Sequence, residues 1–193
     1  SWVNITEFGG PFRATGGNNI DTSSVTGYTL HVFTGNGSFE VKSAPAGSKV
    51  DVLIVGGGGG GGGGANATWH GGGETSMFGS YSASGGGGGD AALAGGQGNF
   101  GGSGGGEAAG SGPSGGGGTA GSFSNNDYTM GHTGGRWYNS GASGGDPYGS
   151  GGGGAGGGGH FTGRRYAGTG GHGVNLSTVF GTSYGESGTF AGG

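Results

Sequence analysis

Residues 56–64 read GGGGGGGGG, and this run of nine glycines restricts the chain to very few ordered structures. An α-helix is disfavoured by about 1 kcal/mol for each glycine relative to alanine, and collagen requires a strict Gly-X-Y period with proline. Silk-like stacked sheets would alternate glycine with alanine or serine, which this run does not. The remaining ordered form is polyglycine II, a left-handed threefold extended helix in which nine residues would span roughly 28 Å.

Glycine also dominates the composition of the whole chain. Of 193 residues 66 are glycine, 28% are apolar and 8% are charged, so an aliphatic core of ordinary size cannot be built. An extended glycine helix has no internal hydrogen bonds, and its amides and carbonyls point outward, where neighbouring helices can pair with them. We therefore expect a bundle of such helices, to which shorter glycine runs contribute at 71–73, 85–89, 104–106, 115–118, 151–154 and 156–159.

The composition divides the chain into two parts. Only eight of the glycines precede Gly56, so residues 1–55 differ sharply from residues 56–193. The first part is rich in β-branched and aromatic residues, which favour strands. We expect a small antiparallel β cap at 1–55 followed by a glycine-rich bundle of polyglycine II helices at 56–193, with almost no α-helix.

Within the first part, the pattern is typical of a β-hairpin over 28–42. Strand-forming residues at 28–34 and 38–42 flank the turn Gly35-Asn36-Gly37, which tolerates positive φ. Residues 49–55 read KVDVLIV and predict a third strand that enters a covered position, because its end is apolar on both faces.

Charge and reactive residues disfavour several classes of function. The formal net charge is −4 and no basic run exceeds Arg164-Arg165, which argues against nucleic-acid binding. The chain has no cysteine, and no apolar stretch approaches the length of a membrane span. Histidines and acidic residues are scattered, and no glycine run continues into G-K-[ST]. The sequence predicts no enzyme, no catalytic residues, no metal site and no cofactor.

Aromatic side chains in the second part gather between the glycine runs. One interpretation is a surface that stacks on sugar rings or contacts a host protein. The competing interpretation is that the same residues cover the ends of the bundle or pack between subunits. The candidate receptor-binding residues are Trp69, Tyr128, Arg136, Trp137, Tyr138, Asn139, Tyr148 and Tyr166.

Three stretches carry a resemblance to a known family. Residues 28–41 read YTLHVFTGNGSFEV, residues 50–64 read VDVLIVGGGGGGGGG, and residues 75–80 read TSMFGS ahead of the run 85–89. Together they resemble the glycine-rich domain of bacteriophage tail-fibre proteins, over residues 25–90. The resemblance implies a structural module of a virion or adhesin, whose distal loops contact receptors on the host surface.

Two functions of different classes are consistent with these features. The first is a phage tail-fibre or adhesin-type domain, located on a virion or outside the cell, which gives rigid display and binds a cell-surface glycan or protein. The second is a self-assembling extracellular filament or matrix subunit with no receptor role. Both include copies of the chain itself as partners. Ice binding by flat glycine faces is a third interpretation, which the bulky aromatic turns disfavour.

Overall fold

In a computed structural model of the chain, the described residues are 11–60, 71–89, 102–106, 131–135, 150–160 and 168–193. They belong to two compact units. The first unit comprises Ser1–Leu53 and Ser177–Gly188, and the glycine unit comprises Ile54–Leu176 and Thr189–Gly193. The change in composition at Gly56 gives no sign that Ser177–Gly188 belongs with the first unit.

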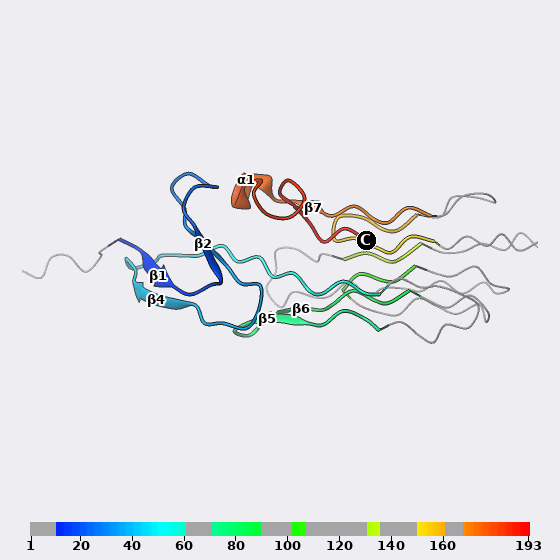
Figure 1. Cartoon of the computed structure of the whole chain (residues 1–193), viewed down its shortest axis with the longest axis horizontal. Coiled ribbons are helices and arrows are strands. Elements are labelled where there is room, and N and C mark those ends of the chain that lie inside the picture. The colour runs from blue at the N-terminus through cyan, green and yellow to red at the C-terminus, as the bar shows by residue number, and fades with distance from the viewer. Residues whose placement is uncertain (1–10, 61–70, 90–101, 107–130, 136–149, 161–167) are drawn as a thin grey trace, which may run out of the picture. The chain divides into compact units, whose positions relative to one another are not determined.

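The strands of the first unit are short and form two antiparallel pairs (Figure 1). β1 (Arg13–Thr15) pairs with β4 (Glu40–Ser43), and β2 (Asn19–Asp21) pairs with β3 (Leu30–Val32). Strands separated by only three residues, β1 and β2, therefore belong to different sheets.

A sharp bend between β1 and β2 makes this pairing possible. Gly16 and Gly17 form the bend with φ of 114° and 97°, which side-chain-bearing residues rarely adopt. A Cβ at Gly16 would also lie 1.9 Å from the carbonyl oxygen of Ser38. Glycine is thus required at this position both for its φ and for the close approach of another part of the backbone.

The predicted hairpin over 28–42 is wrong in its pairing. Its two halves contain β3 and β4, but each of these strands pairs with an earlier part of the chain. A two-residue hairpin turn of type I′ needs positive φ at both central residues. None of Gly35, Asn36 and Gly37 has a positive φ, so the turn does not bring the two strands together.

The predicted third strand is also wrong, because residues 49–55 form no strand. β4 pairs with β1 in a two-stranded sheet, and residues 49–55 do not pair with the other edge of β4. The valines of the stretch are consequently not in covered positions. Val50, Val52 and Val55 are 46%, 45% and 41% exposed.

Helix is nearly absent, since α1 (Ser177–Phe180) is the only helix among the described residues. It ends at Phe180 and is followed by Gly181, whose φ of 72° lies in the left-handed region that commonly follows a helix. Side chains then hold the following residues in the first unit: the hydroxyls of Ser24 and Ser183 form a hydrogen bond (Oγ to Oγ 2.6 Å), and Asn19 Nδ2 donates to Tyr184 Oη (2.9 Å). No helix in the described ranges is long and apolar enough to cross a membrane.

The glycine unit contributes two further antiparallel pairs. β5 (Ser76–Phe78) and β6 (Tyr81–Ala83) form a hairpin whose turn includes Gly79, at φ 60°. β7 (Val174–Asn175) pairs with β8 (Thr189–Phe190). The described residues thus form small antiparallel strand pairs with almost no helix, which confirms that part of the predicted fold.

Side-chain burial contributes little to the described structure. Ala155, which is 9% exposed, is the only buried hydrophobic residue in the described ranges. The other buried positions are mostly glycines of the glycine unit, among them Gly85, Gly87, Gly88, Gly104 and Gly105. A core made of backbone is stable only if its N–H and C=O groups are paired, so the hydrogen bonds between these segments decide the fold of the unit.

Candidate functional site

The first three glycine segments, 56–60, 71–74 and 85–89, are bonded to one another through their backbones. Each segment donates to the next and the third donates back to the first, so the three close a ring. The bonds are Gly57 N to Glu74 O (2.9 Å), Gly60 N to Gly71 O (3.1 Å), Gly73 N to Gly86 O (2.8 Å), Gly86 N to Gly57 O (2.8 Å) and Gly89 N to Gly60 O (2.8 Å). Donors that face the same neighbour are three residues apart.

A second ring repeats this arrangement with segments 102–106, 131–135 and 150–153. Gly104 N donates to His132 O (3.0 Å), Gly135 N to Gly151 O (2.8 Å) and Gly153 N to Gly104 O (2.8 Å). The two rings are joined by reciprocal bonds of 2.7 Å, from Gly87 N to Ser103 O and from Gly102 N to Gly85 O. Figure 1 shows these coloured segments lying side by side.

The C-terminal glycines extend the same network. Segments 168–173 and 191–193 lie beside 150–160, which turns back on itself around Ala155. The bonds are Gly171 N to Gly152 O (2.8 Å), Gly193 N to Gly171 O (2.9 Å), Ala155 N to Ala191 O (2.7 Å), Gly156 N to His172 O (2.9 Å) and His160 N to Thr169 O (2.9 Å). The network therefore runs from Gly57 to Gly193.

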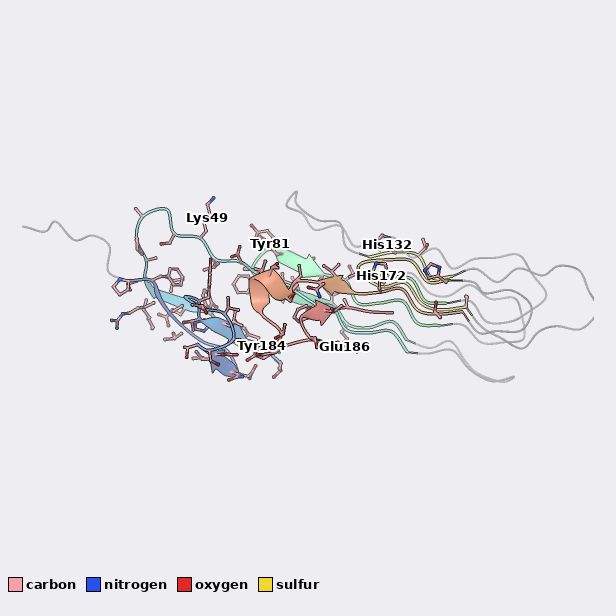
Figure 2. The ribbon with its side chains drawn as sticks, turned by 90° about the horizontal axis from the view of Figure 1, so that it is seen from above. Lys49, Tyr81, His132, His172, Tyr184 and Glu186 are labelled. Atoms are coloured by element: carbon pink, nitrogen blue, oxygen red, sulfur yellow. The ribbon has the colours of Figure 1, made fainter. Side chains whose placement is uncertain are left out.

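Close approach of the backbones explains why glycine is required. A Cβ at Gly59 would lie 2.2 Å from the carbonyl oxygen of Gly87, and one at Gly134 would lie 2.0 Å from that of Gly105. Between such positions the backbone faces outward, and there the sequence places side chains. His132 and Thr133 are both exposed, and Figure 2 shows His132 and His172 projecting from segments that otherwise bear few side chains.

The backbone contacts group the segment ends at two opposite ends of the network, which we call the distal level and the hairpin level. The distal level, away from the β5–β6 hairpin, contains Gly60, Gly71 and Gly89, which are bonded together. The hairpin level contains Gly85 and its bonded partner Gly102.

Further contacts extend both levels. A Cβ at Gly105 would lie 2.2 Å from Gly88 O, and one at Gly106 would lie 2.0 Å from Ser150 O, so Gly106 and Ser150 belong to the distal level. A Cβ at Gly131 would lie 1.7 Å from Gly102 O, which places Gly131 at the hairpin level.

Three pairs of segment ends therefore meet at the distal level. Besides Gly60 with Gly71, these are Gly135, bonded to Gly151, and His160, bonded to Thr169. A Cβ at Gly135 would lie 2.9 Å from His160 O, which brings the last two pairs together. The described residues that flank 61–70, 136–149 and 161–167 therefore lie at this one end.

All eight candidate receptor-binding residues lie outside the described residues. Seven of them belong to the three stretches whose flanking residues meet at the distal level: Trp69, Arg136, Trp137, Tyr138, Asn139, Tyr148 and Tyr166. Tyr128 belongs to 107–130, which connects Gly106 at the distal level to Gly131 at the hairpin level. The sequence predicts these residues by type, but it does not predict that the residues flanking seven of them lie at one end of the network.

Among the described titratable groups, Asp21 of the first unit is the most strongly perturbed. Its carboxylate accepts hydrogen bonds from the N–H groups of Ser23 (2.8 Å) and Ser24 (3.0 Å), from Ser23 Oγ (2.9 Å) and from Ser24 Oγ. The Ser24 side chain, followed by the Ser23 N–H, holds the pKa of Asp21 well below its ordinary range. Desolvation, and secondly the charge of Asp21, raise the pKa of Tyr184. A carboxylate with so many donors stabilises a turn and is a poor proton acceptor.

The described part of the chain gives no metal centre, since no group of three His, Asp or Glu side chains comes together in it. His172 instead packs on backbone: a Cβ at Gly157 would lie 2.3 Å from its Cε1 atom. In comparisons with known proteins, the chain matched no protein family, no characterised sequence and no solved structure.

Proposed function

We propose that this protein is a non-enzymatic display module of the phage tail-fibre or adhesin type, built on a bundle of polyglycine II helices. The backbone hydrogen bonds between the segments are spaced three residues apart. This spacing supports the assignment, because a threefold helix turns the same group toward the same neighbour at every third residue. Gly57 and Gly60 donate to one neighbouring segment, and Gly86 and Gly89 donate to another.

The sign of the backbone φ angles is compatible with a left-handed threefold helix. Left-handed polyproline II geometry has φ near −75°. Glycine has no side chain to select a hand, so runs of either hand are sterically accessible. Among the described glycines of the segments, only Gly131 has a positive φ (130°). All other segment glycines are compatible with one hand, as side-by-side packing of many helices requires.

The observation that carries the display function is the meeting of three pairs of segment ends at the distal level. Backbone hydrogen bonds join the two members of each pair, which are Gly60 and Gly71, Gly135 and Gly151, and His160 and Thr169. The stretches between these pairs contain the aromatic, Arg and Asn residues suited to stacking on sugars and to binding proteins. The rigid unit thus provides anchors for several recognition stretches at once.

The partner class follows from this chemistry. Trp and Tyr offer flat apolar faces with a polar group, and Arg and Asn add hydrogen-bond donors, a combination that suits cell-surface glycans and receptor proteins. We propose a location on the virion or outside the cell, with copies of the chain and a host receptor as partners. No cofactor, nucleic acid or membrane insertion is part of this proposal.

Binding of labelled protein to bacterial cells and to purified surface polysaccharides tests the function. Replacing Trp137 and Tyr138 with Ala is expected to lower binding at least about tenfold, since aromatic anchors dominate such interfaces. Tyr81→Ala is the matched control, because Tyr81 lies in β6 at the hairpin level. Equal binding by the wild type and the double variant would contradict receptor recognition by 136–149.

Electron microscopy separates this function from the filament alternative. The display function predicts monomers or closed oligomers of the purified protein. An endless helical polymer would instead favour a matrix or filament subunit.

A further inference from the structure

The first two glycine segments, 56–60 and 71–74, contain two positions where no contact in the described part of the chain requires glycine. A Cβ at Gly58 or at Gly71 would meet nothing within 4 Å, and both residues are exposed. Neither has a positive φ. A side chain would therefore fit at either position without strain.

At neighbouring positions, by contrast, a Cβ would clash with backbone atoms, so glycine is required there. A Cβ at Gly56 would lie 2.3 Å from Ser84 O, and one at Gly59 would lie 2.2 Å from Gly87 O. Glycine loses more backbone entropy on folding than any other residue, so it is unfavourable where nothing demands it. The absence of a side chain at Gly58 and Gly71 is explained if another backbone approaches there from outside the chain.

Among the described residues, some backbone groups at this edge make no hydrogen bond. Gly57 and Gly60 use their N–H groups for 71–74 and their carbonyls for 85–89. Gly58 and Gly59 make no backbone hydrogen bond within the described part of the chain, and both are exposed. The edge thus presents donors and acceptors together, with no side chain between them and a neighbour.

We propose that the glycine edge, defined as residues 57–60 with Gly71, binds the same edge of a second copy of this chain across a two-fold axis. Only a backbone without side chains can approach as closely as the segments do inside the unit. A second copy supplies one, with donors and acceptors that are complementary under two-fold symmetry. The antiparallel bonding of 57–60 to 71–74 shows that glycine segments of this chain pair in the required orientation.

This inference rests on the proposed bundle but is independent of receptor binding. The test is analytical ultracentrifugation of the full chain over a range of concentrations. We expect the wild type to dimerise reversibly and Gly58→Leu to raise the dimer dissociation constant at least about tenfold. Gly192→Leu is the matched control, because Gly192 is also exposed and its Cβ position is also open, with the nearest atom at 3.8 Å. We expect no change for it.

A single cysteine gives a positive test, since the chain contains none. Two-fold pairing places the same residue of both copies close together, so mild oxidation of Gly58→Cys is expected to yield a covalent dimer and Gly192→Cys is not. Gly71→Leu repeats the ultracentrifugation test if Gly58→Leu does not fold.

Several outcomes would overturn the proposal. These are a wild type that stays monomeric at every concentration, a Gly58→Leu dimer as tight as the wild type, or cross-linking of both cysteine variants alike. Amide exchange of the wild type distinguishes the two proposals: protected segments without a dimer reject only the glycine edge, whereas rapid exchange throughout the segments rejects the bundle itself.

Discussion

The two units of this protein order a chain with few apolar residues by opposite means. In the first unit, side chains make many of the contacts, such as the hydroxyl and amide bonds that hold Ser183 and Tyr184. In the glycine unit, backbone groups of segments far apart in sequence bond directly, as Gly153 N does to Gly104 O. Side-chain hydrogen bonds thus stabilise the first unit, whereas the glycine unit depends on close backbone contacts that side chains would prevent.

This difference reverses the usual rule for mutations. In an ordinary core, removing atoms is harmful because it leaves a cavity. In the glycine unit, adding a single methyl group is harmful, because backbone atoms already occupy the space and cannot rotate away. The two units should therefore respond differently to the same kinds of substitution.

The largest effect is expected from Gly134→Ala. Its Cβ would lie 2.0 Å from Gly105 O, so two segments must separate, and we expect a loss of at least about 3 kcal/mol in the free energy of unfolding. Gly152→Ala is the control, because its nearest atom is at 3.6 Å. It should change stability by less than about 1 kcal/mol. Denaturant unfolding followed by amide exchange measures both, and equal losses would contradict the close-packed network.

The next effect concerns the bend of the first unit. Gly16→Ala combines a φ of 114° with a Cβ 1.9 Å from Ser38 O, and we expect a loss of about 2–3 kcal/mol. Gly27→Ala has a φ of 82° but nothing within 4 Å, so only backbone strain of about 1 kcal/mol is expected. Thermal unfolding of the two variants separates strain from crowding. If Gly27→Ala is the more harmful change, the described bend is incorrect.

A smaller effect is expected from Asp21→Asn, and it depends on pH. The folded pKa of Asp21 is lowered, so its contribution to stability is fully present above the unfolded pKa of about 3.9 and is lost as pH falls toward the folded value. The variant should be less stable than the wild type at pH 7 and should lose the pH dependence below about pH 4 that this group causes. Amide exchange of Ser177–Gly188 at several pH values checks this. A difference that persists unchanged at low pH would point to another cause.

The smallest effect is expected from Lys42→Ala. Lys42 Nζ lies 2.6 Å from Glu40 Oε2, but the two side chains are 51% and 63% exposed. Exposed ion pairs contribute about 0–1 kcal/mol, so the midpoint of thermal unfolding should hardly move, and added salt should not change the difference much. A large loss would mean that β4 depends on this pair.

The failed strand predictions show a limit of local pattern. The residues of β3 and β4 were correctly recognised as strand-forming, because β-branched and aromatic residues favour extended structure wherever they occur. Their partners depended on Gly16 and Gly17, whose φ values turn the chain between sheets. The Gly35-Asn36-Gly37 sequence is compatible with a tight hairpin turn, but a compatible sequence is not sufficient for the turn to form.

The candidate site was predictable only as a set of residue types. Trp137 and Tyr138 could be selected because aromatic residues between glycine runs suit recognition. The shared level of the residues that flank these stretches and the stretch around Trp69 could not, since it depends on Gly60 pairing with Gly71 and Gly135 with Gly151. Glycine runs have nearly identical local sequences, so the local sequence does not specify which run pairs with which.

The sequence by itself determined the kind of order that this chain can have. With 66 glycines and 28% apolar residues, a side-chain core was excluded and backbone pairing remained. Only the tertiary structure decided the partners of β3 and β4, the return of Ser177–Gly188 to the first unit and the closed rings of glycine segments. The physical reason is that side chains carry specificity along the sequence, whereas backbone groups are identical, so their pairing is set by the spatial path of the whole chain.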